Sequence, residues 1–329
     1  MIRFQRRAFL SGTLASVIGI SSCRTADKVS DLSNSPTPAK SGVQPIIDMH
    51  AHAFAANGEK DYYGNPSPVD DDILCLQTYE AYRKWNVVKA VISGSLEYVE
   101  RWKSKDVDNR MIRGILMFSP DLNYRYPHWG GIEISRFEEL VKNGKIEVFG
   151  EIGAIYGGTT LNDPGWQPYL AICAQYDIPV CVHTGDMAPN AHSWAPEARL
   201  SLGDPYLIEA VLLRYPKLRV YLAHAGIEWD EHTLSLLNVH PNLYTDVSCL
   251  LWIDPMAKRT GREFLAKVKE DKNLDRVMFG SDQIRHPHGI GMSIEYLNSL
   301  EFLSDQDKRD ILYNNAARFL RLEQHENKR

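Results

Sequence analysis

The sequence lacks a surplus of positive charge and, after its first segment, any long apolar run. Its 329 residues include 37 basic and 42 acidic side chains, which gives a formal net charge of −5. A general nucleic-acid-binding protein should be basic, so no nucleic-acid partner is expected. A membrane-spanning helix needs ~20 consecutive apolar residues, and no stretch after the N-terminal segment reaches that length. What remains has the composition of an ordinary globular domain.

Cysteine pairs and phosphate-binding glycine loops are missing as well. No two of the five cysteines form a C-x-x-C pair. The paired glycines near residues 130 and 157 lack the strand–loop–helix context that a phosphate loop needs. We therefore expect four cysteines to be small buried hydrophobic residues: Cys75, Cys173, Cys181 and Cys249.

The first 23 residues are typical of an export signal. Arg6 and Arg7, followed by Ala8-Phe9-Leu10, resemble a twin-arginine signal, and an apolar run of signal-peptide length extends to Ser22. Ile20-Ser21-Ser22-Cys23 resembles a bacterial lipobox, which would make Cys23 the lipidated first residue after cleavage. We expect export to the periplasmic face of a bacterial membrane with a lipid anchor on Cys23; the alternative is a plain secretory signal with an incidental cysteine.

Residues 45–322 predict a single (β/α)8 barrel. They follow a polar tether at 24–44, which has no apolar pattern and cannot bury a core, and they precede a polar tail at 323–329. Strand patterns alternate with helical patterns, which indicates a parallel sheet, and eight such units favour a closed barrel over an open doubly wound sheet. The predicted strands are 45–50, 87–93, 111–118, 146–152, 178–184, 218–224, 242–247 and 276–281. The helix after the seventh strand is predicted at 260–270.

The first of these strands ends in His50-Ala51-His52. Residues two apart on a strand point to the same face, so His50 and His52 should project together. A pair of imidazoles on a rigid element is part of what a transition metal requires. A chance His-x-His at a strand end is the alternative, and further ligands decide between the two.

Four more metal-ligand side chains stand at the carboxyl ends of other predicted strands. Glu151 ends the fourth strand, His183 the fifth, His224 the sixth and Asp282 the eighth. A closed barrel brings these ends into one ring, where barrel enzymes keep their active sites. Histidine and carboxylate are the ligands of catalytic zinc, so we expect a Zn²⁺ site, with other divalent metals possible.

In this order the motifs resemble the amidohydrolase superfamily. Asp48-x-His50-x-His52, His183, His224-Ala225-Gly226 and Gly280-Ser281-Asp282 carry that likeness. Two further stretches resemble its amidohydrolase-2 branch, which also holds aminocarboxymuconate-semialdehyde decarboxylase: Tyr215 to Gly226, and Asn314-Asn315-Ala316-Ala317-Arg318-Phe319-Leu320.

The resemblance implies roles for the six side chains. His50, His52, His183 and Asp282 would hold a metal, and His224 would bind a second metal or act on the substrate. Two arrangements stay open for Glu151: it bridges two metals, as in some metal-dependent DNases, or it orients a ligand histidine. Asp282 and His224 would be the catalytic groups.

Three residues are candidates for binding the substrate. Arg285 and His286, just after the last strand, could grip a carboxylate, or they could be solvated loop residues. Trp252, after the seventh strand, could line an apolar pocket. Two long loops, 51–70 and 185–203, follow strand ends and could form a lid.

Four functions are compatible with this pattern. A metal-dependent hydrolase of a small ester, lactone or amide ranks first, with metal-activated water and Asp282 as the proton acceptor. A zinc-dependent non-oxidative decarboxylase ranks second. A two-metal phosphodiesterase or nuclease would need Glu151 as a bridge and a basic groove. A non-catalytic surface lipoprotein would have a decayed site, and no ligand position is missing here.

Overall fold

The computed structural model describes residues 43–322. The predicted signal with Cys23, the tether up to residue 42 and the tail at 323–329 lie outside the described residues. Within residues 43–322, no helix combines the length and the apolar character that crossing a bilayer requires.

Eight parallel strands form one sheet in the order of the sequence, as predicted. The sheet closes because residues after the last strand bond to the first: the amide of Met49 donates to the carbonyl of Phe279 (2.9 Å), and that of His52 donates to Gln283 (2.9 Å). The strands are β1 Ile46–Ala53, β2 Val87–Gly94, β3 Met111–Met117, β4 Val148–Ile152, β5 Val180–His183, β6 Val220–Ala223, β7 Leu243–Asp246 and β8 Val277–Met278.

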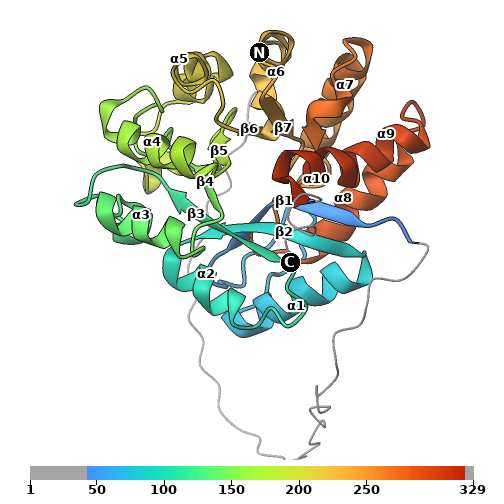
Figure 1. Ribbon diagram of the computed structural model, residues 1–329. Helices are drawn as coiled ribbons and strands as arrows, with labels where there is room; N and C mark the ends of the chain where they lie inside the picture. Colours follow the sequence, from blue (N-terminus) through green and yellow to red (C-terminus); the bar gives the residue numbers. More distant parts are fainter. Residues whose placement is uncertain (1–42, 323–329) are drawn as a thin grey trace, which may run out of the picture. The chain divides into compact units, whose positions relative to one another are not determined.

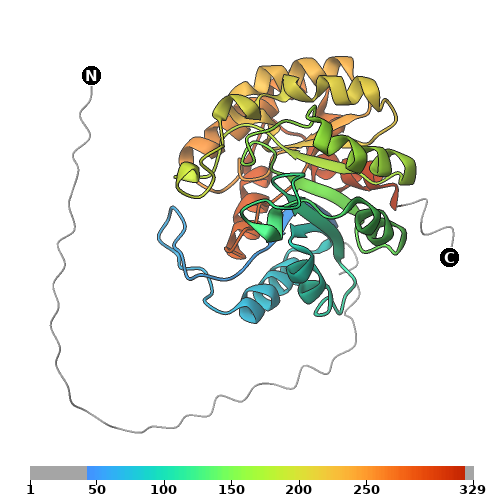
Figure 2. The same ribbon diagram turned by 90° about the vertical axis from the view of Figure 1, so that its left-hand side faces the viewer.

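The helices surround the strands, as Figures 1 and 2 show. Their positions agree with the alternating sequence pattern, and this completes the predicted (β/α)8 architecture. They are α1 Asp71–Lys84, α2 Leu96–Lys103, α3 Ile134–Lys142, α4 Gln167–Tyr176, α5 Glu209–Arg214, α6 Asp230–Val239, α7 Pro255–Glu270, α8 His288–Ser299, α9 Asp305–Arg309 and α10 Asn315–Leu320, with a π-helical turn, Asp310–Asn314, before α10.

Two buried layers hold the barrel together. The larger cluster lies between the strands and the helices. A second cluster takes side chains from all eight strands, so it can meet only inside the barrel, and it includes Phe319 of α10. The Phe319 ring packs on Tyr221 and Tyr244, and its carbonyl accepts from Arg219, the residue before β6. Helix α10 therefore closes the amino-terminal end of the barrel and leaves the carboxyl end for the functional side chains.

Several elements differ from their predicted bounds, and two of them show why. Helix α7 begins at Pro255, not near residue 260, because the Asp254 side chain caps the Ala257 amide (2.8 Å) and proline suits the first helical position. Strand β8 ends at Met278, not at residue 281. The chain beyond it turns, with Asp282 in the left-handed region (φ 50°), and the Asp282 amide donates to the His50 carbonyl (2.8 Å).

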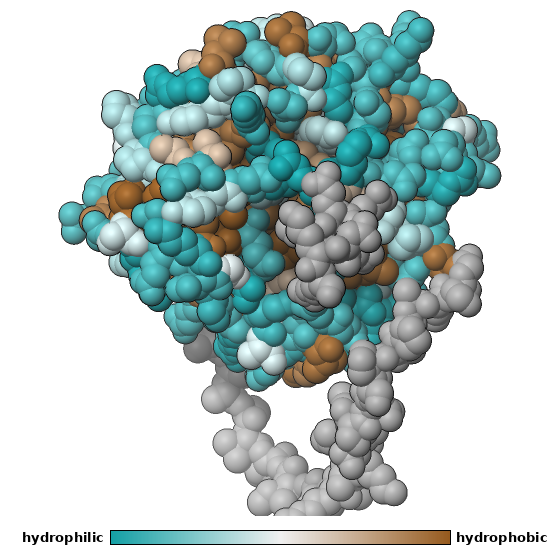
Figure 3. Space-filling view, in the orientation of Figure 1, coloured by the Kyte–Doolittle hydropathy of each residue, from teal (hydrophilic) through white to brown (hydrophobic). Residues whose placement is uncertain are grey.

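The face of the protein drawn in Figure 3 is mostly hydrophilic, with hydrophobic side chains in separate patches. Scattered exposed hydrophobic residues are normal on the surface of a folded domain.

Candidate metal centre

The carboxyl end of β1 places His50 and His52 side by side. Their Nε2 atoms lie 3.2 Å apart, and both residues are buried. The strand register shifts between Asp48 and Ala51, an interval that contains His50, and such bulges re-aim side chains at strand ends. The Asp48 carboxylate fixes the segment, because it accepts from the His50 amide (3.1 Å) and from the Ser281 amide (2.9 Å). Burial raises the pKa of Asp48 to about 6, although the Ser281 hydrogen bonds oppose this shift.

Four ligand atoms have the spacing of one metal site: the Nε2 atoms of this pair and one oxygen each from Asp282 and Glu151. Asp282 Oδ1 lies 3.1 Å from His52 Nε2 and 3.8 Å from His50 Nε2. Glu151 Oε2 lies 3.4 Å from His50 Nε2 and 3.5 Å from His52 Nε2. Bonds of ~2.0–2.2 Å to zinc put the corners of a tetrahedron ~3.4 Å apart. The five distances therefore match a tetrahedral ligand set.

The other oxygen of Glu151 faces a second pair of imidazoles. Glu151 Oε1 lies 2.6 Å from His183 Nδ1 and 3.1 Å from His224 Nε2. All six predicted ligands are thus brought together: Glu151 belongs to one candidate group with His50 and His52 and to another with His183 and His224. Asp282, close to both His50 and His52, also belongs to a group with His224 and Cys249. His183 belongs to the group of Glu151 and His224; it is not grouped with His50, His52 and Asp282.

Hydrogen bonds on the far side of three rings favour positive charge at the centre. His183 Nε2 donates to the carbonyl of Asp186 (2.7 Å), His50 Nδ1 donates to Asp246 (3.0 Å), and His224 Nδ1 faces the carbonyl and hydroxyl of Ser248. If these imidazoles are neutral, each carries one N–H, and the near nitrogen of the ring then turns a lone pair toward the Glu151 carboxylate. Lone pairs and a carboxylate at these distances repel unless a proton or a metal ion lies between them. The donor set therefore fits a divalent metal.

The charges of the buried groups agree with this arrangement. Burial alone would lower the pKa of His50, but the carboxylates of Glu151 and Asp246 outweigh it and raise this pKa well above its usual value. Burial would raise the pKa of Glu151, yet His50 and His183 hold it well below its usual value. Asp282 behaves in the same way: burial opposes ionisation, but a hydrogen bond to His52 and the nearby histidines lower its pKa to about 2. Both carboxylates are therefore ionised at neutral pH.

Two further residues of the centre, Asp246 and Ser248, were not predicted from the sequence. Asp246 ends β7, and its carboxylate accepts from His50 Nδ1 (3.0 Å) and from the amides of His224 and Ser248 (3.0 Å each). A carboxylate that holds the second nitrogen of a ligand histidine fixes the ring's tautomer and orientation. The sequence did contain a signal for Asp246, because this residue ends a strand. The predicted ligands likewise stand at the ends of five other strands.

None of the three predicted substrate residues belongs to the candidate ligand groups around Glu151. Arg285 donates to the Ala55 carbonyl (2.6 Å) and to Glu59 (3.0 Å), so its guanidinium already has partners in the 51–70 loop. Trp252 is buried and donates its indole N–H to the Ser281 carbonyl (2.6 Å). His286 is also buried; burial and the nearby His288 lower its pKa.

Aromatic side chains extend from one side of the centre to the other. Phe54 stacks on His52 with ring centroids 4.7 Å apart, and it reaches Trp129 at 6.0 Å. Phe118 continues the row from Trp129 (4.8 Å) to Tyr156 (4.9 Å), whose ring lies 5.2 Å from His183. We call this row, with Trp194 against Tyr156, the aromatic wall. It comes from the segments that follow β1, β3, β4 and β5.

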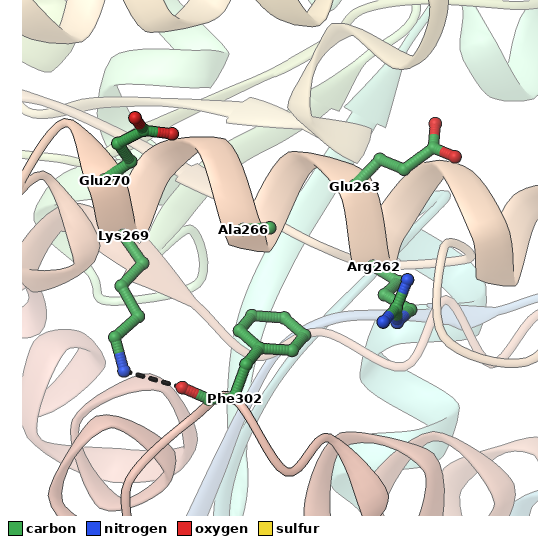
Figure 4. A pocket seen from close by; sticks show the side chains of 6 residues that line it. All are labelled: Arg262, Glu263, Ala266, Lys269, Glu270 and Phe302. Carbon is green, nitrogen blue, oxygen red and sulfur yellow. Dashed lines mark hydrogen bonds between the residues drawn. The ribbon is translucent and has the colours of Figure 1, made fainter.

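A surface hollow shown in Figure 4 is unrelated to this centre. Its lining comes from α7 and from Phe302 after α8: Arg262, Glu263, Ala266, Lys269, Glu270 and Phe302. Lys269 donates to the Phe302 carbonyl (2.6 Å) across it. The hollow belongs to the outer helical layer and contains none of the metal-ligand side chains.

The closed barrel and the imidazole–carboxylate cluster at its carboxyl end define a class: barrel enzymes that hold divalent metal at this face. Comparison with known families then gives the particular assignment. The amidohydrolase family model matches residues 47–322, and the chain belongs to this family of metal-dependent enzymes. A search of curated proteins finds no significant match.

Solved structures with the same fold come from enzymes of different chemistry. A probable 2-pyrone-4,6-dicarboxylic acid hydrolase from Acinetobacter baumannii, with citric acid bound, is 18% identical, with a TM-score of 0.56 over 84% of this chain and 98% of that one. A 2,6-dihydroxybenzoate decarboxylase from Rhizobium is 12% identical, with a TM-score of 0.53 over 85% of this chain and 100% of that one. A 4-oxalomesaconate hydratase from Rhodopseudomonas palustris is 18% identical, with a TM-score of 0.53 over 86% of this chain and 98% of that one. Likeness at this level of identity establishes the fold, and the reaction has to be argued from the site.

Proposed function

We propose that this protein hydrolyses a small ester, lactone or amide and that its centre holds two divalent metal ions, zinc being the first candidate. The observation that carries the proposal is the place of Glu151, whose two oxygens face two separate pairs of imidazoles. One ion would be held by His50, His52, Asp282 and Glu151, and the other by Glu151, His183 and His224. A paired centre suits the activation of water as a nucleophile.

The protein's own groups have distinct tasks in such a reaction. Metal bound here would act as a Lewis acid and lower the pKa of a water molecule. Asp282 is ionised at neutral pH, so it can accept the proton of the attacking water and return it to the leaving group. Asp246 keeps His50 in the tautomer whose Nε2 faces the ligand cluster.

The aromatic wall supports a substrate with an apolar or aromatic substituent. Phe54 and Tyr156 stand directly against His52 and His183, so a substrate at the centre would meet aromatic faces. Arg285, the predicted carboxylate-binding residue, is already paired with Glu59. We therefore rank esters, lactones or amides with an apolar or aromatic group above dicarboxylates and phosphodiesters.

Metal analysis and product analysis test the proposal together. We expect two metal ions at the barrel centre of the purified protein, and hydrolysis of members of a panel of aryl esters, lactones and amides. Replacement of Asp282 by Asn should lower turnover ~10²–10⁴-fold, because a positioned proton acceptor contributes about that much. Release of carbon dioxide from an aromatic acid, with one metal per chain, would instead establish the decarboxylase alternative. Turnover unchanged in the Asp282→Asn variant would overturn the role of that residue.

We also propose, from the sequence alone, that Cys23 carries a lipid that anchors the exported protein to a membrane. The motif Ile20-Ser21-Ser22-Cys23 supports this. In a bacterial host, labelled fatty acid should be incorporated into the protein, and a Cys23→Ser variant should lose the label. Labelling that persists in this variant would contradict the anchor.

A further inference from the structure

A second group of metal-ligand side chains lies outside the barrel centre. Asp61 belongs to the 51–70 loop after β1, whereas His286 and His288 stand where the chain leaves the β8 end and enters α8. One ligand atom of each residue lies within 4.8 Å of the others. None of the three belongs to the six-residue centre described above.

His286 is the unexplained member of this group. Its side chain is buried, with 7% of the residue exposed, and Nδ1 has no hydrogen-bond partner among the described residues. Leaving a buried nitrogen without a partner is unfavourable, so proteins rarely keep one without a reason. A bound cation would supply that partner.

Asp61 and His288 are already aligned with each other. His288 Nε2 lies 2.7 Å from Asp61 Oδ2, and the Asp61 side chain is only 2% exposed. The Asn65 amide donates to Asp61 Oδ1 (2.8 Å) and the Asn65 side chain donates to Oδ2 (3.0 Å), which fixes the carboxylate in place. A carboxylate held in this way is preorganised as a ligand.

We propose that Asp61, His286 and His288 form a peripheral divalent-metal site, which we call the loop site. Two imidazoles and a carboxylate are a donor set for zinc, and three protein ligands leave a position for water. Zinc bonds of ~2.0–2.2 Å require ligand atoms ~3.4 Å apart. To bind zinc, the loop site therefore needs the 2.7 Å contact between Asp61 and His288 to open slightly.

Metal at the loop site would fasten the 51–70 loop to the start of α8. The loop is otherwise tied to this region by Arg285, which donates to Ala55 and Glu59, and by Tyr63, whose hydroxyl donates to the Trp252 carbonyl (3.1 Å). The same loop begins with Phe54, which stacks on His52 of the metal centre. Occupation of the loop site thus orders the segment that carries one end of the aromatic wall.

Zinc titration of the full-length protein tests the loop site. Metal-free wild type, His286→Gln and His288→Gln are equilibrated with buffered zinc, and the bound zinc is counted. His192→Gln is the matched control, because His192 is an exposed loop histidine outside every candidate ligand group. We expect the two test variants to bind one zinc fewer per chain than wild type and the control.

A second readout separates the loop site from the central one. Zinc should slow protease cleavage within residues 51–70 in wild type and in His192→Gln, and slow it much less in His288→Gln. Asp61→Asn keeps the shape of the side chain. It replaces either histidine variant that does not show the circular-dichroism spectrum of the folded protein. Equal zinc stoichiometry and equal protection in wild type and in the folded loop-site variants would overturn the proposal.

Discussion

Glu151 is the residue on which the arrangement of the metal centre depends. One of its oxygens faces His50 and His52, and the other faces His183 and His224. A glutamate that only oriented one ligand histidine would not need two imidazoles at each oxygen. Asp246 and Ser248, which lie behind the ligand rings, matter almost as much. Their hydrogen bonds decide which ring nitrogen is free to bind a metal.

Asp246 provides a test of that supporting layer. Asn at this position can present an N–H to His50 Nδ1 and so favour the wrong tautomer. We expect Asp246→Asn to lower the affinity for zinc ~10–100-fold, which is the usual effect of losing a hydrogen-bond partner of a ligand histidine. Competition with a chromogenic chelator measures the affinity. Asp275→Asn, an exposed replacement near β8, should leave it unchanged; equal affinity in both variants would contradict the role of Asp246.

The cysteines of the described region should be chemically inert. Cys75, Cys173, Cys181 and Cys249 are buried, and burial raises the pKa of each thiol, that of Cys75 to about 12. The thiolate is the reactive form, so these residues should resist alkylation at pH 8 in the folded protein. Peptide mapping after iodoacetamide treatment, with and without denaturant, measures this. Rapid alkylation of any of the four in the native protein would contradict the buried assignment.

At the scale of elements, the helices are placed by caps and by close contacts with the chain segments that follow the strands. Helix α7 shows both. Asp254 caps its start, and Gly261 in its middle lies against the chain after β7. A Cβ added at Gly261 would meet the Leu250 carbonyl oxygen at 2.4 Å. Glycine is unfavourable within a helix, so its presence there reflects this approach rather than helix propensity.

Gly261→Ala therefore tests whether packing outweighs propensity. Alanine gains up to ~1 kcal/mol of helix propensity. Overpacking against a backbone atom costs about 1–3 kcal/mol. We expect the free energy of unfolding to fall by about 1 kcal/mol or more in urea denaturation. Glu263→Ala, on the exposed face of the same helix, is the control and should change the free energy of unfolding by at most about 0.5 kcal/mol. A Gly261→Ala variant more stable than wild type would refute the close packing.

At the scale of the whole molecule, the metal centre joins distant parts of the barrel. Its six ligands come from five strand ends, and Asp246 adds a sixth. The same region closes the sheet, because the segment after β8 bonds to β1 next to His50 and His52. Metal binding and barrel closure should therefore be coupled.

Removal of metal should lower the stability of the barrel as a whole. A ligand present at a thousand times its Kd stabilises the folded state by ~4 kcal/mol. For a domain of this size that corresponds to a drop in Tm on the order of 10 °C. We expect dialysis against a chelator to produce this drop in a thermal melt and zinc to reverse it. Calcium, which prefers oxygen ligands, is the control and should not restore Tm. A Tm that does not change on chelation would argue against a metal centre.

Much of the fold could be predicted because its signals are local. Apolar runs and helical patterns alternate along the chain, and this gave the eight strands and the barrel. Boundaries were less accurate where a side-chain contact decides them, as at Asp254 before α7 and at the turn after Met278. The export signal and the lipid on Cys23 remain predictions.

The sequence by itself determined the list of candidate metal ligands, since His50, His52, Glu151, His183, His224 and Asp282 each follow a strand pattern, and the order of those strands set them around one ring. Only the tertiary structure decided how the ligands divide. Which two nitrogens face which oxygen of Glu151 depends on side-chain directions and on hydrogen bonds from the far side of each ring, such as that of Asp246 to His50. The loop site depends likewise on a contact across more than 200 residues of chain, between Asp61 and His288. Local pattern fixes which face of an element a residue occupies, whereas distances between side chains arise only when the barrel closes.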